Sequence, residues 1–355
     1  MEENIFLDTS IFVQENFLHS KRIQQFLELC SDGKIRLILT IITINEIKSQ
    51  FKKRAHTAVE IHNGLIKNRD LWVLKNSSES NRLEKFTKPD IITDQFNKQL
   101  DEALVKANAK IIDYPVINTK VVFDKYFNGA FPFNKGDKKH EFPDAIALYA
   151  IEEWCTAKGK RCILFSKDKD FLKSKMQPGI TVQKNFEVFM DQLLKRFNPE
   201  RMSLVQQIYT DNSVHLDAEL SKWIREELDD VSIYTDFTDY YEVHDIEVPL
   251  IEVVEKTYTI LQVGEEMIDI EVVANVNIKI VLTIDDSETG FYDSEEGEVL
   301  FRETTELPIE QELEITFVVS FYIVDKDDYD TMVEVTEFNN GQSIKLENHN
   351  RNIYY

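Results

Sequence analysis

The chain has 355 residues with 43% hydrophobic content, enough for two or three globular domains with sizeable cores. Its cysteines, Cys30, Cys155 and Cys162, form no CxxC or Cys/His pattern, which argues against a disulfide framework or a zinc site and suits a reducing cytoplasm. The acidic start and the lack of an apolar run of about 18 residues predict neither a signal peptide nor a membrane span.

The net charge of −23 is distributed unevenly along the chain. From Arg201 onward there are 9 basic and 37 acidic residues, which leaves 32 basic and 27 acidic residues before that point. The N-terminal part is therefore compatible with a nucleic-acid partner, whereas the C-terminal part would repel one.

The first elements alternate between strand and helix patterns. Asn4–Leu7 is an apolar strand that ends at Asp8-Thr9-Ser10, and two helical patterns follow, the second ending at Ser31-Asp32-Gly33. The β-branched run Arg36–Thr43 predicts another strand. A long helix then opens with Thr43-Ile44-Asn45-Glu46 and carries a basic group that consists of Lys48, Lys52, Lys53 and Arg54.

The middle of the chain predicts a helix over Thr93–Ala109 and a short strand over Lys110–Tyr114. A loop from Tyr126 to His140 follows, with three lysines at Lys135, Lys138 and Lys139. These lysines fit a solvated surface and contacts with a phosphate backbone equally well.

The segment Glu141–Phe171 reads as a helix followed by a strand. Phe142-Pro143-Asp144 begins the helix, with proline at an opening position where its missing N–H costs nothing, and Gly159 ends it. Arg161–Phe165 is a short buried strand, and Ser166, Asp168 and Asp170 come directly after it. In an open α/β sheet, ligands bind at the edge where the strands end.

The alternation of strand and helix patterns ends with a possible edge strand at Ile180–Val182 and a closing helix at Phe186–Arg196. This alternation predicts a mostly parallel sheet with flanking helices. A helix over Leu204–Leu228 follows. Five strand-like segments then predict an antiparallel β domain, either a sandwich or a curved sheet: Glu247–Ile260, Met267–Ile284, Glu298–Glu306, Glu312–Asp325 and Thr331–Phe338. We therefore expect an α/β domain over residues 1–197, a helical connector over 198–232, and an acidic antiparallel β domain over 233–355.

Four junctions between predicted elements carry an acid, namely Asp8, Glu46, Asp144 and Asp168. Each acid alone has an ordinary explanation, since first-turn acids are favoured by capping and the helix dipole, and Thr43-x-x-Glu46 fits a capping box. A doubly wound sheet, however, would bring several of these junctions to one edge. Carboxylates gathered there would repel one another unless a hard divalent cation such as Mg²⁺ or Mn²⁺ were bound.

Four segments in this order, IFLDTSIF, TINEI, EFPDAI and LFSKDKDF, resemble the signature segments of PIN-domain nucleases, which are metal-dependent ribonucleases. The resemblance covers residues 1–190 and implies that Asp8, Glu46, Asp144 and Asp168 coordinate the metal and catalyse the reaction. Asp170 matches a less constant acid of the metal site. Thr9 and Ser10 match the hydroxyl position that supports the first acid, and Glu141 is an extra carboxylate outside the pattern. The long insertion between Glu46 and Asp144 and the acidic β domain depart from the smallest family members.

The resulting hypothesis is an endoribonuclease that uses Mg²⁺ or Mn²⁺ to hydrolyse phosphodiester bonds, with single-stranded RNA as the expected substrate. The basic group on the long helix and the loop lysines would contact the phosphate backbone. By family analogy, a toxin or phage-defence role is expected. A structure-specific DNA nuclease and a catalytically inert interaction protein are the alternatives. The acidic β domain would dock a protein partner, shield the basic face or assemble an oligomer.

Overall fold

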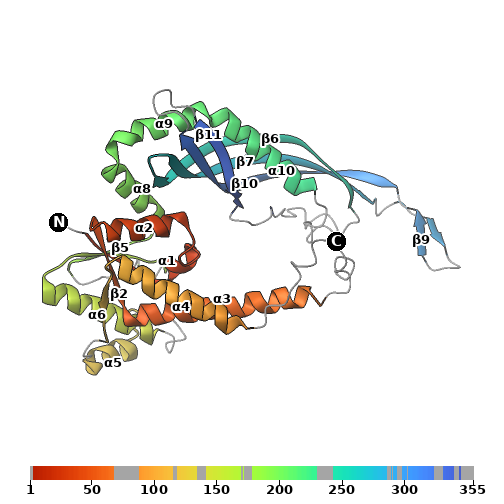
Figure 1. Ribbon diagram of the computed structural model, residues 1–355. Helices are drawn as coiled ribbons and strands as arrows, with labels where there is room; N and C mark the ends of the chain where they lie inside the picture. Colours follow the sequence, from red (N-terminus) through yellow and green to blue (C-terminus); the bar gives the residue numbers. More distant parts are fainter. Residues whose placement is uncertain are drawn as a thin grey trace. The chain divides into compact units, whose positions relative to one another are not determined.

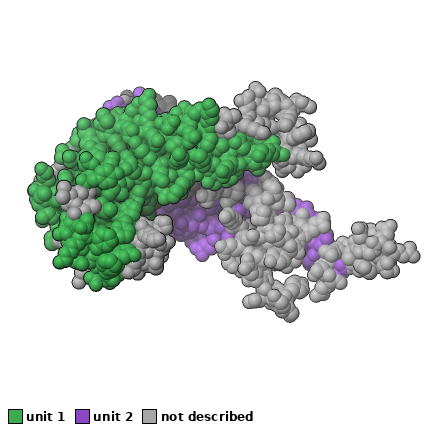
Figure 2. Space-filling view, turned by 90° about the horizontal axis from the view of Figure 1, so that it is seen from below, with its two compact units in different colours: residues 1–190 green, residues 191–355 purple. Residues whose placement is uncertain are grey.

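The computed structural model describes residues 3–67, 88–114, 118–133, 141–168, 171, 178–229, 243–285, 289, 291–293, 298–301, 303–323, 331–339 and 344. The chain divides into two compact units, which are coloured separately in Figure 2: unit 1 over residues 1–190 and unit 2 over residues 191–355.

Unit 1 is built on a five-stranded parallel sheet in the order β3-β2-β1-β4-β5 (Figure 1). The strands are β1 (Glu3–Leu7), β2 (Ile35–Thr40), β3 (Lys110–Ile112), β4 (Cys162–Phe165) and β5 (Ile180–Gln183). Every pair is parallel, and the central strand β1 pairs with β2 on one side and with β4 on the other. The strand–helix alternation thus correctly predicted a parallel sheet with β5 at its edge.

The helices that accompany this sheet are α1 (Thr9–Gln14), α2 (Lys21–Ser31), α3 (Ile41–Leu65), α4 (Pro89–Lys106), α5 (Thr119–Asn128), α6 (Phe142–Lys158) and the start of α8 (Phe186–Phe197). Fully buried aromatic rings pack two of these helices, α2 and α8, against the sheet. Phe186 of α8 contacts Phe26 of α2 and Phe165 of β4 in edge-to-face geometry, with centroids 5.4 and 5.5 Å apart. Such contacts fix the helices against the strands and therefore fix the loops at the strand ends.

The boundary between β2 and α3 differs from the prediction. The strand ends at Thr40 and the helix begins at Ile41, although Ile41, Ile42 and Thr43 are β-branched. The Thr40 hydroxyl accepts a hydrogen bond from the Thr43 backbone N–H at 3.0 Å, so Thr40 is the N-cap of α3. The expected capping box from Thr43 to Glu46 is therefore wrong, because Thr43 already lies inside the helix and the local cap outweighs the strand propensity of the next residues.

Unit 2 combines a short 3₁₀ turn, η3 (Pro199–Arg201), and two helices, α9 (Met202–Asp211) and α10 (Ser213–Asp229), with an antiparallel sheet in the order β11-β10-β7-β6. The strands are β6 (Val243–Val263), β7 (Met267–Asp285), β10 (Thr304–Ile323) and β11 (Thr331–Phe338). A separate two-stranded ribbon pairs β8 (Phe291–Asp293) with β9 (Glu298–Phe301). The described residues thus form one larger sheet and one ribbon.

In the core of unit 2, buried and partly exposed residues alternate along β7. Every even-numbered residue of β7 from Ile268 to Ile284 is buried, while most odd-numbered residues are partly exposed. Helix α10 contacts β6 and buries a stripe of four apolar residues, Leu216, Leu220, Ile224 and Leu228. The sequence predicted one helix over Leu204–Leu228, but Asn212 ends α9 and its side-chain amide donates to the Ile208 carbonyl at 2.9 Å. This local bond competes with helix continuation.

The predicted fold class is confirmed, with a parallel α/β unit followed by helices and an antiparallel β unit. A search of the helices within the described ranges found none with the length and apolar character that a bilayer crossing requires. The domain limits at residues 197 and 232 stay a prediction.

Candidate active site

The carboxyl ends of β1 and β4 lie side by side in unit 1. The sheet register pairs Leu7, the last residue of β1, with Phe165, the last residue of β4. The Asp8 backbone N–H extends this pairing by donating to the Phe165 carbonyl at 3.0 Å. Asp8 and Ser166 therefore leave their strands next to each other, at the edge where parallel sheets bind ligands.

Three donors hold the Asp8 carboxylate. The Ser10 hydroxyl donates to Asp8 Oδ2 at 2.6 Å, the Ser166 hydroxyl donates at 2.9 Å, and the Ser10 backbone N–H donates at 3.4 Å. The last bond makes Asp8 the N-cap of α1, so the capping interpretation is correct for this residue. Capping does not explain the bond from Ser166, which is far away in the sequence.

Ser166 connects two of the predicted acids. Its hydroxyl donates to Asp8 and accepts a hydrogen bond from the Asp168 backbone N–H at 3.1 Å, while the side chain is fully buried. The neighbouring Lys167 N–H donates to the Ser10 hydroxyl at 3.1 Å. Ser166 was not among the predicted site residues, although its place directly after the strand and two residues before Asp168 was a usable signal.

Glu46 reaches the same edge from the second turn of α3. The Thr9 hydroxyl, which follows Asp8 in the chain, donates to Glu46 Oε2 at 3.1 Å. Burial raises the pKa of the Glu46 carboxyl; the Thr9 hydrogen bond opposes that rise, and the charge of Asp8 adds to it. Because the charge of Asp8 contributes to the raised pKa of Glu46, the two carboxylates are close in space.

Asp144 lies in the first turn of α6, where it was predicted, and α6 begins with no side-chain cap from its N-cap residue Glu141. Burial and, after it, the charges of Glu46, Asp8, Glu141 and Asp168 in that order together raise the pKa of Asp144 to about 8. The other three predicted acids and the extra carboxylate Glu141 are therefore within electrostatic reach of Asp144.

The chemistry of this group fits a hard divalent cation. Its donors are carboxylate oxygens supported by hydroxyls, with none of the sulfur or imidazole ligands that zinc prefers. Neighbouring carboxylates repel one another, and a cation that binds among them removes this repulsion. Within the described part of the chain, no three His, Cys, Asp or Glu side chains are arranged as a preformed metal site. The carboxylates of Asp8 and Glu46 hydrogen bond to hydroxyl groups instead.

The basic group on α3 has intramolecular partners. Lys48 forms an ion pair with Asp101 at 2.7 Å, Lys52 lies 3.7 Å from Asp90, and the Arg54 guanidinium lies over the Phe17 ring, 5.8 Å from its centroid. Lys53 is exposed. Their proposed phosphate contacts stay a prediction. Asp170 and the loop lysines Lys135, Lys138 and Lys139 lie outside the described residues.

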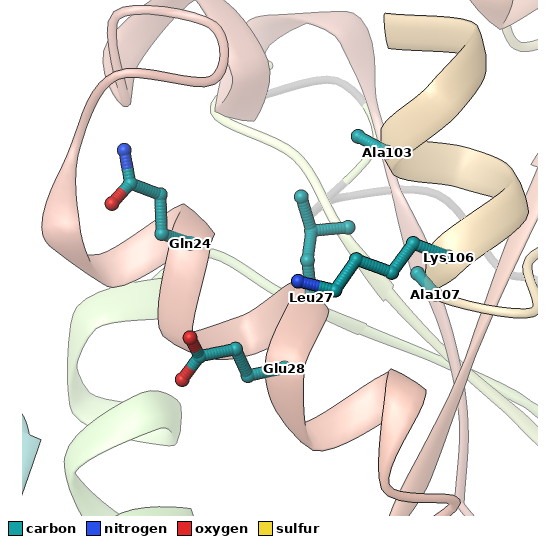
Figure 3. A pocket seen from close by; sticks show the side chains of 6 residues that line it. All are labelled: Gln24, Leu27, Glu28, Ala103, Lys106 and Ala107. Carbon is teal, nitrogen blue, oxygen red and sulfur yellow. The ribbon is translucent and has the colours of Figure 1, made fainter. Parts of the chain in front are cut away.

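A pocket of about 270 Å³ lies between α2 and α4, away from the acids (Figure 3). It is lined by Gln24, Leu27 and Glu28 of α2 and by Ala103, Lys106 and Ala107 at the C-terminal end of α4. It shares no residue with the group of acids.

Unit 1 thus belongs to the class of parallel α/β domains that gather acids at the carboxyl edge of the sheet. Residues 5–171 match a family model described as PIN domain. This segment of unit 1 is therefore a PIN domain, and PIN domains are in general nucleases that use divalent metal ions. No curated protein and no solved structure matched the chain significantly.

Proposed function

We propose that unit 1 is a divalent-metal-dependent endoribonuclease that hydrolyses phosphodiester bonds in single-stranded RNA. The observation that carries this proposal is the electrostatic coupling of Asp144 to Asp8, Glu46 and Asp168, which come from four separate elements. A fold that needed these acids only as caps or surface charges would have no reason to gather them half-buried within electrostatic reach of Asp144, because such a grouping is costly without a cation.

Asp8, Glu46, Asp144 and Asp168 are the residues that would hold Mg²⁺ or Mn²⁺. When bound, the ion supplies Lewis-acid activation of water and neutralises charge on the scissile phosphate. Ser10 and Ser166 orient the Asp8 carboxylate, and Ser166 also holds the backbone at Asp168. Asp144 keeps a proton near neutral pH while no cation is present, and cation binding would release it.

The test compares the full chain with Asp144→Asn and Asp8→Asn in cleavage of a labelled single-stranded RNA with Mn²⁺. Both substitutions keep the size of the side chain and remove its charge, so we expect cleavage to fall by orders of magnitude while the protein stays folded. Glu153→Gln is the matched control, because Glu153 is an exposed carboxylate later in the same helix, and this variant should cleave like the parent. If Asp144→Asn cuts RNA as fast as the parent, the assignment is wrong.

Metal titration separates the nuclease from an inert interaction protein. A cation that binds only the native state raises the melting temperature of the parent, and the increase should be smaller for Asp144→Asn. No increase and no cleavage would favour the inert protein. Faster cleavage of flapped DNA than of single-stranded RNA would favour a DNA-directed nuclease with the same group of acids.

A further inference from the structure

Helix α5 exposes a pair of aromatic rings that its own unit does not cover. Phe127 is 74% exposed and Phe123 is 46% exposed. The two rings lie nearly parallel, with centroids 6.1 Å apart and an angle of 29° between their planes. We call Phe123 and Phe127 the aromatic platform. Large rings are costly to leave in water, so a stacked and exposed pair indicates a surface that binds something.

The platform is anchored to the helix that carries Asp144. Below the exposed rings, Tyr126 and Phe142 pack against a small buried cluster that consists of Val122, Phe133 and Ala145. Phe142 is the first residue of α6, two residues before Asp144, and its ring centroid lies 5.9 Å from that of Phe123. Tyr126 contacts both Phe127 and Phe142, with centroids 5.3 Å from each. A continuous set of rings therefore runs from the platform to the start of α6.

Charge on α5 favours a polyanion over an apolar protein surface as the partner. Lys120 is exposed and precedes Phe123 by three residues and Phe127 by seven, so it lies on the same face of the helix. Lys125 adds a second cation on another face of the helix, and Asp124 is the single acid of this helix. Aromatic rings beside lysines match a strand with unpaired bases, because bases stack on the rings and phosphates pair with the cations.

We propose that the aromatic platform stacks unpaired bases of the strand that the proposed nuclease site would cleave. This inference rests on the proposed function for its ligand and deepens it, because stacking requires bases that are free of a complementary strand. The platform would hold the substrate beside Asp144 without touching the scissile phosphate, so Phe123 and Phe127 are positioning residues.

Binding of a short, fluorescently labelled uridine oligomer to the full chain, measured by anisotropy in EDTA, tests this inference without any cleavage. Loss of stacking on one base weakens binding by about 5- to 150-fold on replacement of the ring by alanine. We expect a loss in this range for Phe127→Ala and a loss of similar size for Phe127→Leu, which keeps an apolar side chain but has no aromatic face. Phe127→Tyr should bind like the parent.

Two controls make the result specific. Val105→Ala removes another exposed apolar side chain, 78% exposed on α4, and should leave binding unchanged. An abasic oligomer with the same phosphates should bind the parent and Phe127→Leu equally. Equal binding of the uridine oligomer by the parent, Phe127→Ala and Phe127→Leu would overturn the inference. Binding that is lost in Phe127→Ala but retained in Phe127→Leu would also overturn it, because that result indicates an apolar contact without base stacking.

These outcomes are independent of catalysis. If the Phe127 variants bind like the parent while Asp144→Asn abolishes cleavage, the platform is disproved and the nuclease stands. If the chain cleaves nothing but loses binding in Phe127→Leu, the platform stands as a binding surface and the nuclease proposal fails.

Discussion

The two units use acidic residues in opposite ways. Unit 1 gathers the half-buried Glu46 and Asp144 at one end of a parallel sheet, where burial raises the pKa of both carboxyls and the charge of Asp8 adds to the rise in each. Unit 2 has far more acids, but they are distributed along antiparallel strands, as with Glu310 and Glu314 on β10. Parallel strands connected by helices all end at the same edge, whereas antiparallel strands end alternately at opposite edges. Topology therefore concentrates charge in one unit and spreads it in the other.

The largest effect on stability is expected in the core of unit 2. Leu220→Ala removes a fully buried side chain from α10 and leaves a cavity, so we expect the free energy of unfolding of unit 2 to fall by about 2–5 kcal/mol. Chemical denaturation followed by tryptophan fluorescence measures this loss, since Trp223 lies on the same helix. RNA cleavage by unit 1 should stay unchanged under native conditions. A parallel loss of cleavage would show that the two units depend on each other.

Ser166→Ala should have the next largest effect and act on unit 1. The change removes one hydrogen-bond donor to Asp8 and the acceptor of the Asp168 N–H. Loss of such buried hydrogen bonds lowers the free energy of unfolding by about 1–3 kcal/mol. We expect a lower melting temperature and weaker Mn²⁺-induced stabilisation, both measured by thermal shift. Ser31→Ala at the end of α2, near the opposite edge of the sheet, is the control. Equal effects in the two variants would contradict the special role of Ser166.

The pH dependence of stability should distinguish the gathered acids from the dispersed ones. Asp144 has an ordinary pKa of 3.8 when unfolded and a pKa of about 8 when folded, so between these values the native state binds the extra proton. The stability contribution of this group is therefore fully present below pH about 4 and is lost as the pH rises towards 8, by at most about 1.4 kcal/mol per pH unit. Denaturation of the metal-free parent and of Asp144→Asn across this window measures the difference. Identical slopes would refute the raised pKa.

The smallest effect is expected from a single dispersed acid. Glu310→Gln removes an exposed ion pair in which Lys279 Nζ lies 3.1 Å from the Glu310 carboxylate. Such pairs contribute about 0–1 kcal/mol because water and salt screen them. Denaturation at low and high salt should therefore give nearly the same stability for this variant and the parent. A decrease in the free energy of unfolding as large as that expected for Leu220→Ala would contradict the view that the acids of unit 2 act independently.

Much of unit 1 was readable from local patterns. The short apolar runs at β1 and β4 predicted buried strands, Pro143 and Gly159 marked the two ends of α6, and the acids at the element junctions were visible in the sequence. The end of β2 was misplaced because strand propensity continues through Ile41 and Ile42, while the cap formed by Thr40 depends on how the chain turns out of the sheet. Propensity describes single residues, and a cap is a property of their arrangement.

The sequence by itself determined which residue types stand at the ends of the strands and that the two parts of the chain differ in charge and in strand pattern. Only the tertiary structure decided that Ser166 connects Asp8 to Asp168, that Thr9 holds Glu46, and that Phe123 and Phe127 form a platform beside α6. The physical reason is that periodicity and local propensity act over a few residues. The hydrogen bonds from Ser166 to Asp8 and from Thr9 to Glu46 join residues that are 158 and 37 positions apart, and they exist only once the sheet register has brought those segments together.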